Sequence, residues 1–175
     1  MINLVHDLDT LRFLCGEITQ VYAQARSEVR KLEVEDALSI SLSFRNGMLG
    51  TILASDACPS PWSYESTTHE NPHFFHADES CYHLLGTNGA LAFPAMELWR
   101  YADEGMKGWA HPLDCERVEV ETSDPLQKQI EHFCNVIMGK ETSVLDAENG
   151  AKSLAVALAV QKSSLQGVPI DPATL

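Results

Sequence analysis

The feature that most constrains the fold is a strict two-residue alternation between positions 37 and 44. In this segment, ALSISLSF, large apolar residues take every second position and serines lie between them. A period of two predicts a β-strand with one apolar face and one face of small hydroxyl groups. The next residues, RNG, are typical of a tight turn, and MLGTILASDA again has strand character. We therefore expect an antiparallel β-hairpin.

More strands are predicted on both sides of this hairpin. Residues 18–25 precede it, and SCYHLLGTNGALAFP contains two strand segments joined by an Asn-Gly turn. The segments MELWRYA and ERVEVE are two further candidates. Most of these strands, about six in all, are neighbours in the sequence, which favours antiparallel or mixed pairing.

Helical patterns occupy both ends of the chain. Leucines recur at intervals of three or four residues between positions 4 and 14, and Gly16 follows as a helix stop. Asp124 and Pro125 are typical of a helix start, and an apolar face continues from there to Ile137. A last helix is expected from about Asp146 through the alanine-rich SLAVALAV, which suggests close packing on a sheet or another helix.

The order helix, strands, helices predicts an α+β fold. We expect an open, predominantly antiparallel or mixed β-sheet of about six strands with helices packed on one face. The other face is either solvated surface or an isologous contact with a second copy, and its flatness favours the contact. The hydroxyl side chains expected on it are Ser39, Ser41, Ser43, Thr51 and Ser55.

Length and charge exclude several classes of protein. The 175 residues fit one domain, and a net charge of −13 predicts repulsion from nucleic acid and from anionic membranes. The longest apolar stretch, residues 153–160, is too short to span a bilayer. The N-terminus lacks the pattern of a secretory signal, and the five cysteines have no paired spacing. Both features predict a cytoplasmic protein with reduced thiols.

Residues 59–78 form a long segment without periodicity, which is typical of a binding loop. Asp56 precedes it, and Trp62, Tyr64 and Glu65 lie within it. Carboxylates accept hydrogen bonds from sugar hydroxyls and aromatic rings cover apolar C–H surfaces, so these residues are candidate polyol ligands. For the two aromatic residues the alternative is ordinary packing, with Trp62 anchoring the loop on the sheet.

The same loop invites a metal hypothesis. His69, His73 and His76 have ligand-like spacing, and Cys81 follows. A zinc site needs three or four converging donors, which loop histidines rarely supply. We expect no metal; instead, either these histidines belong to the loop surface, or His76 reaches the substrate cleft.

Four segments, in this order, resemble the C-terminal domain of the Gfo/Idh/MocA family, which includes glucose-fructose oxidoreductase and inositol dehydrogenase. They are INLVHDLDTLRFLCGEI, VEDALSISLSFRNGMLGTILASDA, CYHLLGTNGALAFPAMELWRY and residues 124–171. Together they cover nearly the entire chain. The resemblance implies the dihydrodipicolinate reductase-like fold of that domain.

Members of this family begin with a Rossmann domain that binds NAD(P), but no GxGxxG occurs in this sequence. The resemblance therefore implies that residues 1–175 are a single C-terminal domain for substrate binding and oligomerisation, beginning at the domain junction. The Rossmann domain, with the family's Glu-Lys-Pro lysine, would be missing. We expect NAD or NADP in the full-length protein, no cofactor in this chain, and no activity from this chain alone.

The resemblance places the family's active-site histidine on His6. Histidine suits transfer of a hydroxyl proton near neutral pH. Many members carry an acidic residue four positions earlier, where this chain has Ile2. Asn3 beside it is placed among the substrate-binding residues. The alternative for His6 is a ring held by hydrogen bonds near a helix start, and Asp9 is interpreted as a helix cap ahead of a partner for the imidazole.

These observations lead to one main hypothesis and two alternatives. The main hypothesis is the substrate-binding domain of an NAD(P)-dependent oxidoreductase that acts on a sugar, cyclitol or related polyol, as a homodimer or higher oligomer through the sheet. The first alternative is a non-enzymatic sugar-binding or protein-interaction module. The second is a metal-dependent enzyme built on the loop histidines.

Overall fold

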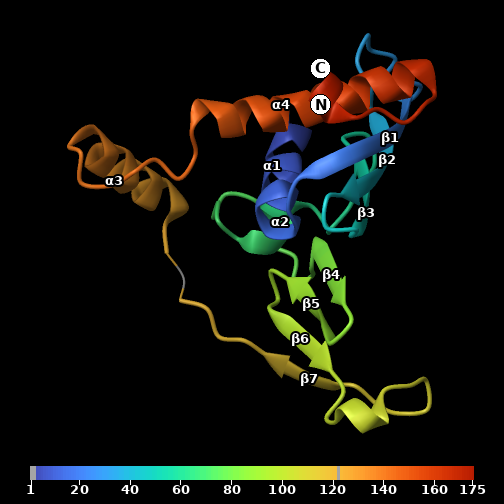
Figure 1. Ribbon diagram of the computed structural model, residues 1–175, viewed down its shortest axis with the longest axis vertical. Helices are drawn as coiled ribbons and strands as arrows, with labels where there is room; N and C mark the ends of the chain where they lie inside the picture. The colour runs from blue at the N-terminus through green and yellow to red at the C-terminus, as the bar shows by residue number, and fades with distance from the viewer. Residues whose placement is uncertain (1–2, 122) are drawn as a thin grey trace. The chain divides into compact units, whose positions relative to one another are not determined.

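The fold is taken from a computed structural model, which describes residues 3–121 and 123–175 (Figure 1). The chain divides into two compact units. The first unit comprises the described residues up to Pro59 together with Ser143–Leu175, and the second comprises the described residues from Ser60 to Thr142. None of the described helices is both long enough and apolar enough to cross a bilayer.

The first unit contains a three-stranded antiparallel sheet with strand order β1-β2-β3. The strands are β1 (Ile18–Arg26), β2 (Ala37–Phe44) and β3 (Leu49–Ser55). The alternating segment forms β2 over the predicted residues, and Ile40 of β2 lies opposite Ile52 of β3. The predicted hairpin is therefore confirmed.

Two helices complete the first unit. Helix α4 (Ala147–Gln166) packs along β1, and helix α1 (Leu4–Cys15) packs against α4 (Figure 1). Val21 and Ile40 on the covered face of the sheet are buried, as are Val156 and Val160 of α4. The expectation that the alanine-rich helix packs closely is confirmed, and a short 3₁₀ turn, η2 (Pro172–Thr174), follows it.

The opposite face of this sheet carries the hydroxyl side chains that the sequence predicts. Ser39, Ser41, Thr51 and Ser55 are exposed there, and Ser43 is half-buried. Two leucines of β3 share this face, because Leu49 and Leu53 are 76% and 86% exposed. The face is thus mixed in polarity, with two large apolar side chains at its β3 side.

The second unit contains a four-stranded antiparallel meander with strand order β4-β5-β6-β7. Its strands are β4 (Tyr82–Gly86), β5 (Gly89–Phe93), β6 (Glu97–Arg100) and β7 (Asp114–Arg117). A short helix, α2 (Tyr64–Thr68), precedes them, and a 3₁₀ turn, η1 (Glu104–Met106), lies between β6 and β7. The α+β class and the antiparallel pairing are confirmed, with the described strands divided between two sheets.

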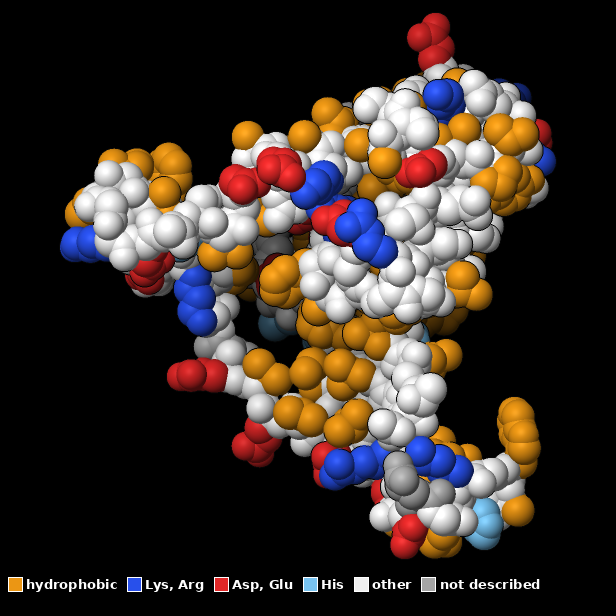
Figure 2. Space-filling view, in the orientation of Figure 1, with side chains coloured by type: hydrophobic (Ala, Val, Ile, Leu, Met, Phe, Trp, Pro, Cys, Tyr) orange, Lys and Arg blue, Asp and Glu red, His pale blue; other side chains and the backbone are white. Residues whose placement is uncertain are grey.

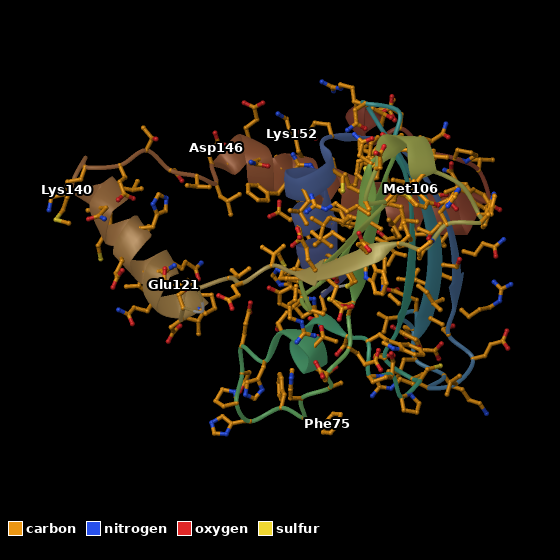
Figure 3. All side chains as sticks on the ribbon, turned by 90° about the horizontal axis from the view of Figure 1, so that it is seen from below. Phe75, Met106, Glu121, Lys140, Asp146 and Lys152 are labelled. Atoms are coloured by element: carbon orange, nitrogen blue, oxygen red, sulfur yellow. The ribbon has the colours of Figure 1, made fainter. Side chains whose placement is uncertain are left out.

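Helix α3 (Pro125–Ile137) starts where Asp124 and Pro125 predict. Asp124 Oδ1 accepts hydrogen bonds from the backbone N–H of Leu126 and Gln127 at 2.9 and 3.1 Å. Asp146, labelled in Figure 3, caps α4 in the same way through the N–H of Asn149 at 2.8 Å. No residue of α3 is buried, so the apolar face expected on it is exposed.

Arg12 holds α1 against α4. It is only 7% exposed, and its Nη1 donates to Asn149 Oδ1 at 2.9 Å and to Ser153 Oγ at 2.6 Å. Its Nη2 and Nε donate to the two carboxylate oxygens of Glu17 at 2.9 and 3.1 Å. A planar guanidinium suits such a site because its five N–H groups diverge in fixed directions. One side chain thereby joins the start of β1, α1 and α4.

We expect R12M to lower the free energy of unfolding by about 2–4 kcal/mol, measured by urea denaturation. The substitution keeps an apolar stem but leaves Glu17 and the polar groups of α4 without their donor. The exposed Arg26 provides the control, since R26M should change stability by less than about 0.5 kcal/mol. Equal stability of the two variants would show that Arg12 is not the anchor.

Candidate functional site

His6 lies on the first turn of α1, and its side chain is exposed. Its backbone N–H donates to Asn3 O at 3.1 Å, which begins the helix. Among the described residues the imidazole makes no hydrogen bond or ion pair. The ring is therefore available to a ligand, as a proton-transfer group must be.

Asn3 occupies the N-cap position of α1, but its side chain makes no capping hydrogen bond. It is exposed, and it lies three residues before His6. Residues three apart at a helix start lie on one side of the helix. The carboxamide and the imidazole thus share one exposed side, while Ile2 lies outside the described residues.

Asp9 does not cap α1, because the helix begins at Leu4. That expectation is wrong. Asp9 Oδ1 instead accepts a hydrogen bond from Ser153 Oγ at 2.5 Å and lies 3.5 Å from Arg12 Nη1. Asp9 makes no hydrogen bond to His6 in the described part of the chain, so its carboxylate belongs to the α1–α4 junction.

Polar contacts and a glycine turn also hold the C-terminal end of α1 in place. The hydrogen bond from Arg12 lowers the pKa of Glu17 below its ordinary value. Gly16 turns the chain with a φ of +94°, a conformation that favours glycine, and Asn46 Nδ2 donates to Cys15 O at 2.9 Å. His6 is therefore carried on a helix that is anchored at several points.

Asp56 follows β3 and forms an ion pair with Arg30. Asp36 holds the backbone at Arg30 in place, because its Oδ2 accepts hydrogen bonds from the backbone N–H groups of Val29 and Arg30 at 2.8 and 2.9 Å. Asp36 is buried, and sequence reasoning missed it. The carboxylate of Asp56 remains more than half exposed, so it retains acceptor capacity beside Arg30.

The loop aromatic residues lie in the second unit. Tyr64 opens α2, and its ring packs against Tyr82 and Phe93 with centroids 6.3 and 6.2 Å away. Its hydroxyl donates to Glu70 at 2.8 Å. Trp62 is 61% exposed and Glu65 is exposed, so Tyr64 is the residue that anchors the loop to the four-stranded sheet.

His76 lies beyond α2, where its ring contacts that of His69 with centroids 4.6 Å apart. Phe75 beside it is at the outer edge of this loop (Figure 3). Within the described residues no three histidine, cysteine or acidic side chains are placed to hold a metal ion. The histidines therefore form a ring pair, and no metal centre is assembled from them in that part of the chain.

The predicted site residues thus fall into three groups. Asn3 and His6 share one side of α1, and Asp56 pairs with Arg30 in the same unit without a hydrogen bond to His6. The third group, in the second unit, is Trp62, Tyr64, Glu65 and His76.

The described residues do not form a dinucleotide site of their own. Every pair of named strands is antiparallel, and no strand leads through a glycine-rich turn into a helix in the described ranges. A Rossmann site requires that parallel strand–turn–helix unit. The described residues therefore do not form a Rossmann site for NAD(P).

Comparison with known families decides the identity of the fold. The model of the oxidoreductase family's C-terminal alpha/beta domain matches residues 1–171. The chain belongs to the Gfo/Idh/MocA oxidoreductase family. No curated protein matches this Gfo/Idh/MocA domain.

Several solved structures share the fold. They include the WlbA dehydrogenase from Bordetella pertussis in complex with NADH and UDP-GlcNAcA, with a TM-score of 0.63, 20% identity, and coverage of 97% of this chain and 43% of that one. An oxidoreductase from Agrobacterium radiobacter in complex with NAD+, L-tartaric acid and magnesium matches with a TM-score of 0.65 and 19% identity, and the match covers 97% of this chain and 48% of that one. UDP-N-acetylglucosamine 3-dehydrogenase GnnA from Acidithiobacillus ferrooxidans matches with a TM-score of 0.66 and 21% identity, and the match covers 91% of this chain and 46% of that one. The chain spans less than half the length of each, and identities this low establish the fold alone.

The lowered pKa of Glu17 predicts how stability depends on pH. A carboxylate with a depressed folded pKa stabilises above its unfolded pKa, about 4.3 for Glu, and loses that contribution as pH falls through the folded value. The difference in unfolding free energy between wild type and E17Q should therefore be largest near pH 7 and narrow below about pH 4.5. It is measured by urea denaturation across pH.

The same comparison made in an R12M background supplies the control. Arg12 is the main cause of the lowered pKa of Glu17. The difference in unfolding free energy caused by E17Q should therefore narrow less with falling pH in the R12M background than in the wild type. Identical narrowing in both backgrounds would mean that Arg12 does not set the titration of Glu17.

Proposed function

We propose that this chain is the C-terminal substrate-binding and dimerisation domain of an NAD(P)-dependent oxidoreductase that acts on a sugar, cyclitol or related polyol. The observation that carries the proposal is the family match over residues 1–171, together with a length below half that of the oxidoreductases sharing the fold. Two of those relatives are named for, or bound to, UDP-linked amino sugars or their derivatives, which supports a sugar-like substrate. A Rossmann domain outside these residues would hold the nucleotide.

In this proposal His6 handles the proton. Oxidation of a substrate hydroxyl to a carbonyl releases the hydroxyl proton, and an exposed imidazole without a competing partner is suited to accept it. Asn3, on the same side of α1, offers a carboxamide that both donates and accepts hydrogen bonds. Anchoring of α1 by Arg12 keeps both groups at a fixed orientation, which catalysis by positioning requires.

The remaining predicted residues are proposed substrate contacts. Asp56 would accept hydroxyl donors with the lone pairs that Arg30 leaves free, and Glu65 would do the same from α2. Trp62 would cover an apolar C–H face with its exposed ring, while Tyr64 and His76 would border that surface. Isolated from its nucleotide-binding partner, the chain would be inactive.

The proposed dimer uses the open face of the three-stranded sheet. Leu49 and Leu53 give this face two exposed apolar anchors among small hydroxyl groups. A surface of this kind suits a self-complementary contact around a two-fold axis. A cytoplasmic location is part of the proposal, since all five cysteines are free among the described residues.

The catalytic proposal is tested in the full-length protein. H6N should lower kcat by about 10²–10⁴-fold in NAD(P)H absorbance assays with a panel of polyols and sugars, because general-base catalysis contributes that much. It should also abolish the limb of the pH–rate profile that reports the base, while NADH binding followed by fluorescence stays unchanged. His111, exposed on a loop of the second unit, gives the matched control H111N, with unchanged kcat.

Two results would contradict this assignment. Micromolar binding of NADH to the 175-residue chain alone would place the nucleotide site here. Wild-type kcat and an unchanged pH profile in H6N would remove His6 from the chemistry and favour the non-enzymatic binding module.

The dimer is tested with L49K/L53K. Each lysine would bury an unpaired charge within the contact, so the dimer dissociation constant should rise by about 30-fold or more in sedimentation or light-scattering measurements. Leu85, equally exposed on β4 of the other sheet, gives the control L85K, which should remain dimeric. A monomeric wild type at high concentration would rule out the proposed contact.

A further inference from the structure

A polar hollow of about 220 Å³ lies on the four-stranded sheet of the second unit. Its floor is a row that crosses all four strands, because the pairing register aligns His83, Ala92, Glu97 and Arg117. The segment before β4 supplies its wall through Asp78, Glu79 and Ser80. The apolar row Leu84, Leu91 and Leu98 belongs to the opposite face of the same sheet. Figure 2 shows hydrophobic side chains gathered over the region of β4, β5 and β6.

Ser80 is the most telling member of this hollow. It is only 9% exposed, and its hydroxyl, which makes no hydrogen bond within the described residues, still reaches solvent. Because Ser80 lines the hollow, a molecule bound there can take the place of water as the hydrogen-bond partner of this hydroxyl.

The hollow is lined by both negative and positive side chains. Asp78 and Glu79 form no ion pair in the part of the chain that the structure describes, so two carboxylates lack a cation. Arg117 is 61% exposed at its side chain and meets Glu97 through a single contact at 3.4 Å. Most of the five N–H donors of its guanidinium are therefore unused.

We propose that this hollow binds a small zwitterion, a molecule of amino-acid size that carries one ammonium and one carboxylate group. The ammonium faces Asp78 and Glu79, and the carboxylate faces Arg117, which can hold it with two parallel hydrogen bonds. Ser80 and His83 supply neutral hydrogen bonds between these charged ends. The site contains none of the residues assigned to the oxidoreductase function, so it stands independently of that proposal.

Other ligand classes fit this hollow less well. A metal ion is disfavoured because no three ligating side chains converge among the described residues. A simple amine leaves Arg117 unused, and a neutral polyol leaves both carboxylates without a counter-charge. The volume is below the range of about 300–1,000 Å³ typical of sites for drug-sized ligands, which favours a molecule as small as an amino acid.

The test is an NMR titration of the 175-residue chain with glycine, β-alanine and γ-aminobutyrate. These probes vary the distance between ammonium and carboxylate, while ethylamine, acetate and glycerol at equal ionic strength present one group or neither. At least one zwitterion should saturate the amide shifts of Ser80 and His83 with tenfold higher affinity than any of the three single-function probes. Equal or tighter binding of ethylamine, acetate or glycerol, or no saturable shift with any zwitterion, would overturn the proposal.

Matched variants separate binding from folding. E79Q and R117Q should each weaken the best zwitterion at least tenfold, whereas R100Q and E116Q, whose parent residues pair with each other on the opposite face, should not. E97Q removes the residue that competes for Arg117, and it should tighten binding. A loss of affinity in E97Q, or unchanged affinity in R117Q, would contradict the assignment of Arg117 to the carboxylate.

Discussion

The buried guanidinium of Arg12 is the interaction on which the first unit depends. It bonds to a carboxylate at the start of β1 and to the carbonyl and side chains of the first turns of α4, more than 130 residues away in the sequence. A charge removed from water in this way is stable only when its donors are satisfied, and here they are. The same contacts set the direction of α1, and therefore the direction in which Asn3 and His6 present their side chains.

The anchored helix α1 carries two of the groups that the proposed function uses, Asn3 and His6. The fold of a Gfo/Idh/MocA C-terminal domain offers an exposed imidazole on a rigid helix start, a paired but accessible carboxylate at Asp56, and an aromatic loop fixed by Tyr64. None of these groups alone specifies a reaction. Together with a length below half that of the oxidoreductases of the same fold, they support the proposal that this domain contributes substrate contacts and proton transfer while another domain holds the nucleotide.

Local patterns predicted the elements well and tertiary contacts poorly. The strand at 37–44 follows from its period of two, and α3 follows from Asp124 and Pro125, because each signal acts within a few residues. Arg12 was missed because a charge is normally placed on the solvent side, although its spacing from Leu4 and Leu8 puts it on the buried face. Asp9 was misassigned because its partner, Ser153, is distant in the sequence, so no local pattern could indicate the contact. Periodicity also does not report which strands pair, so it did not reveal that β3 and β4 are the one pair of consecutive described strands that does not pair.

The discontinuous first unit has a consequence for biosynthesis. Its N-terminal helix and hairpin leave the ribosome well before α4, so their apolar face stays uncovered until residues 147–166 have been made. The four-stranded meander is contiguous in the sequence and can form while the nascent chain is still growing. Because α4, and Ile170, which pairs with Val21, are made after the meander, the first unit is completed only after the second unit has been synthesised.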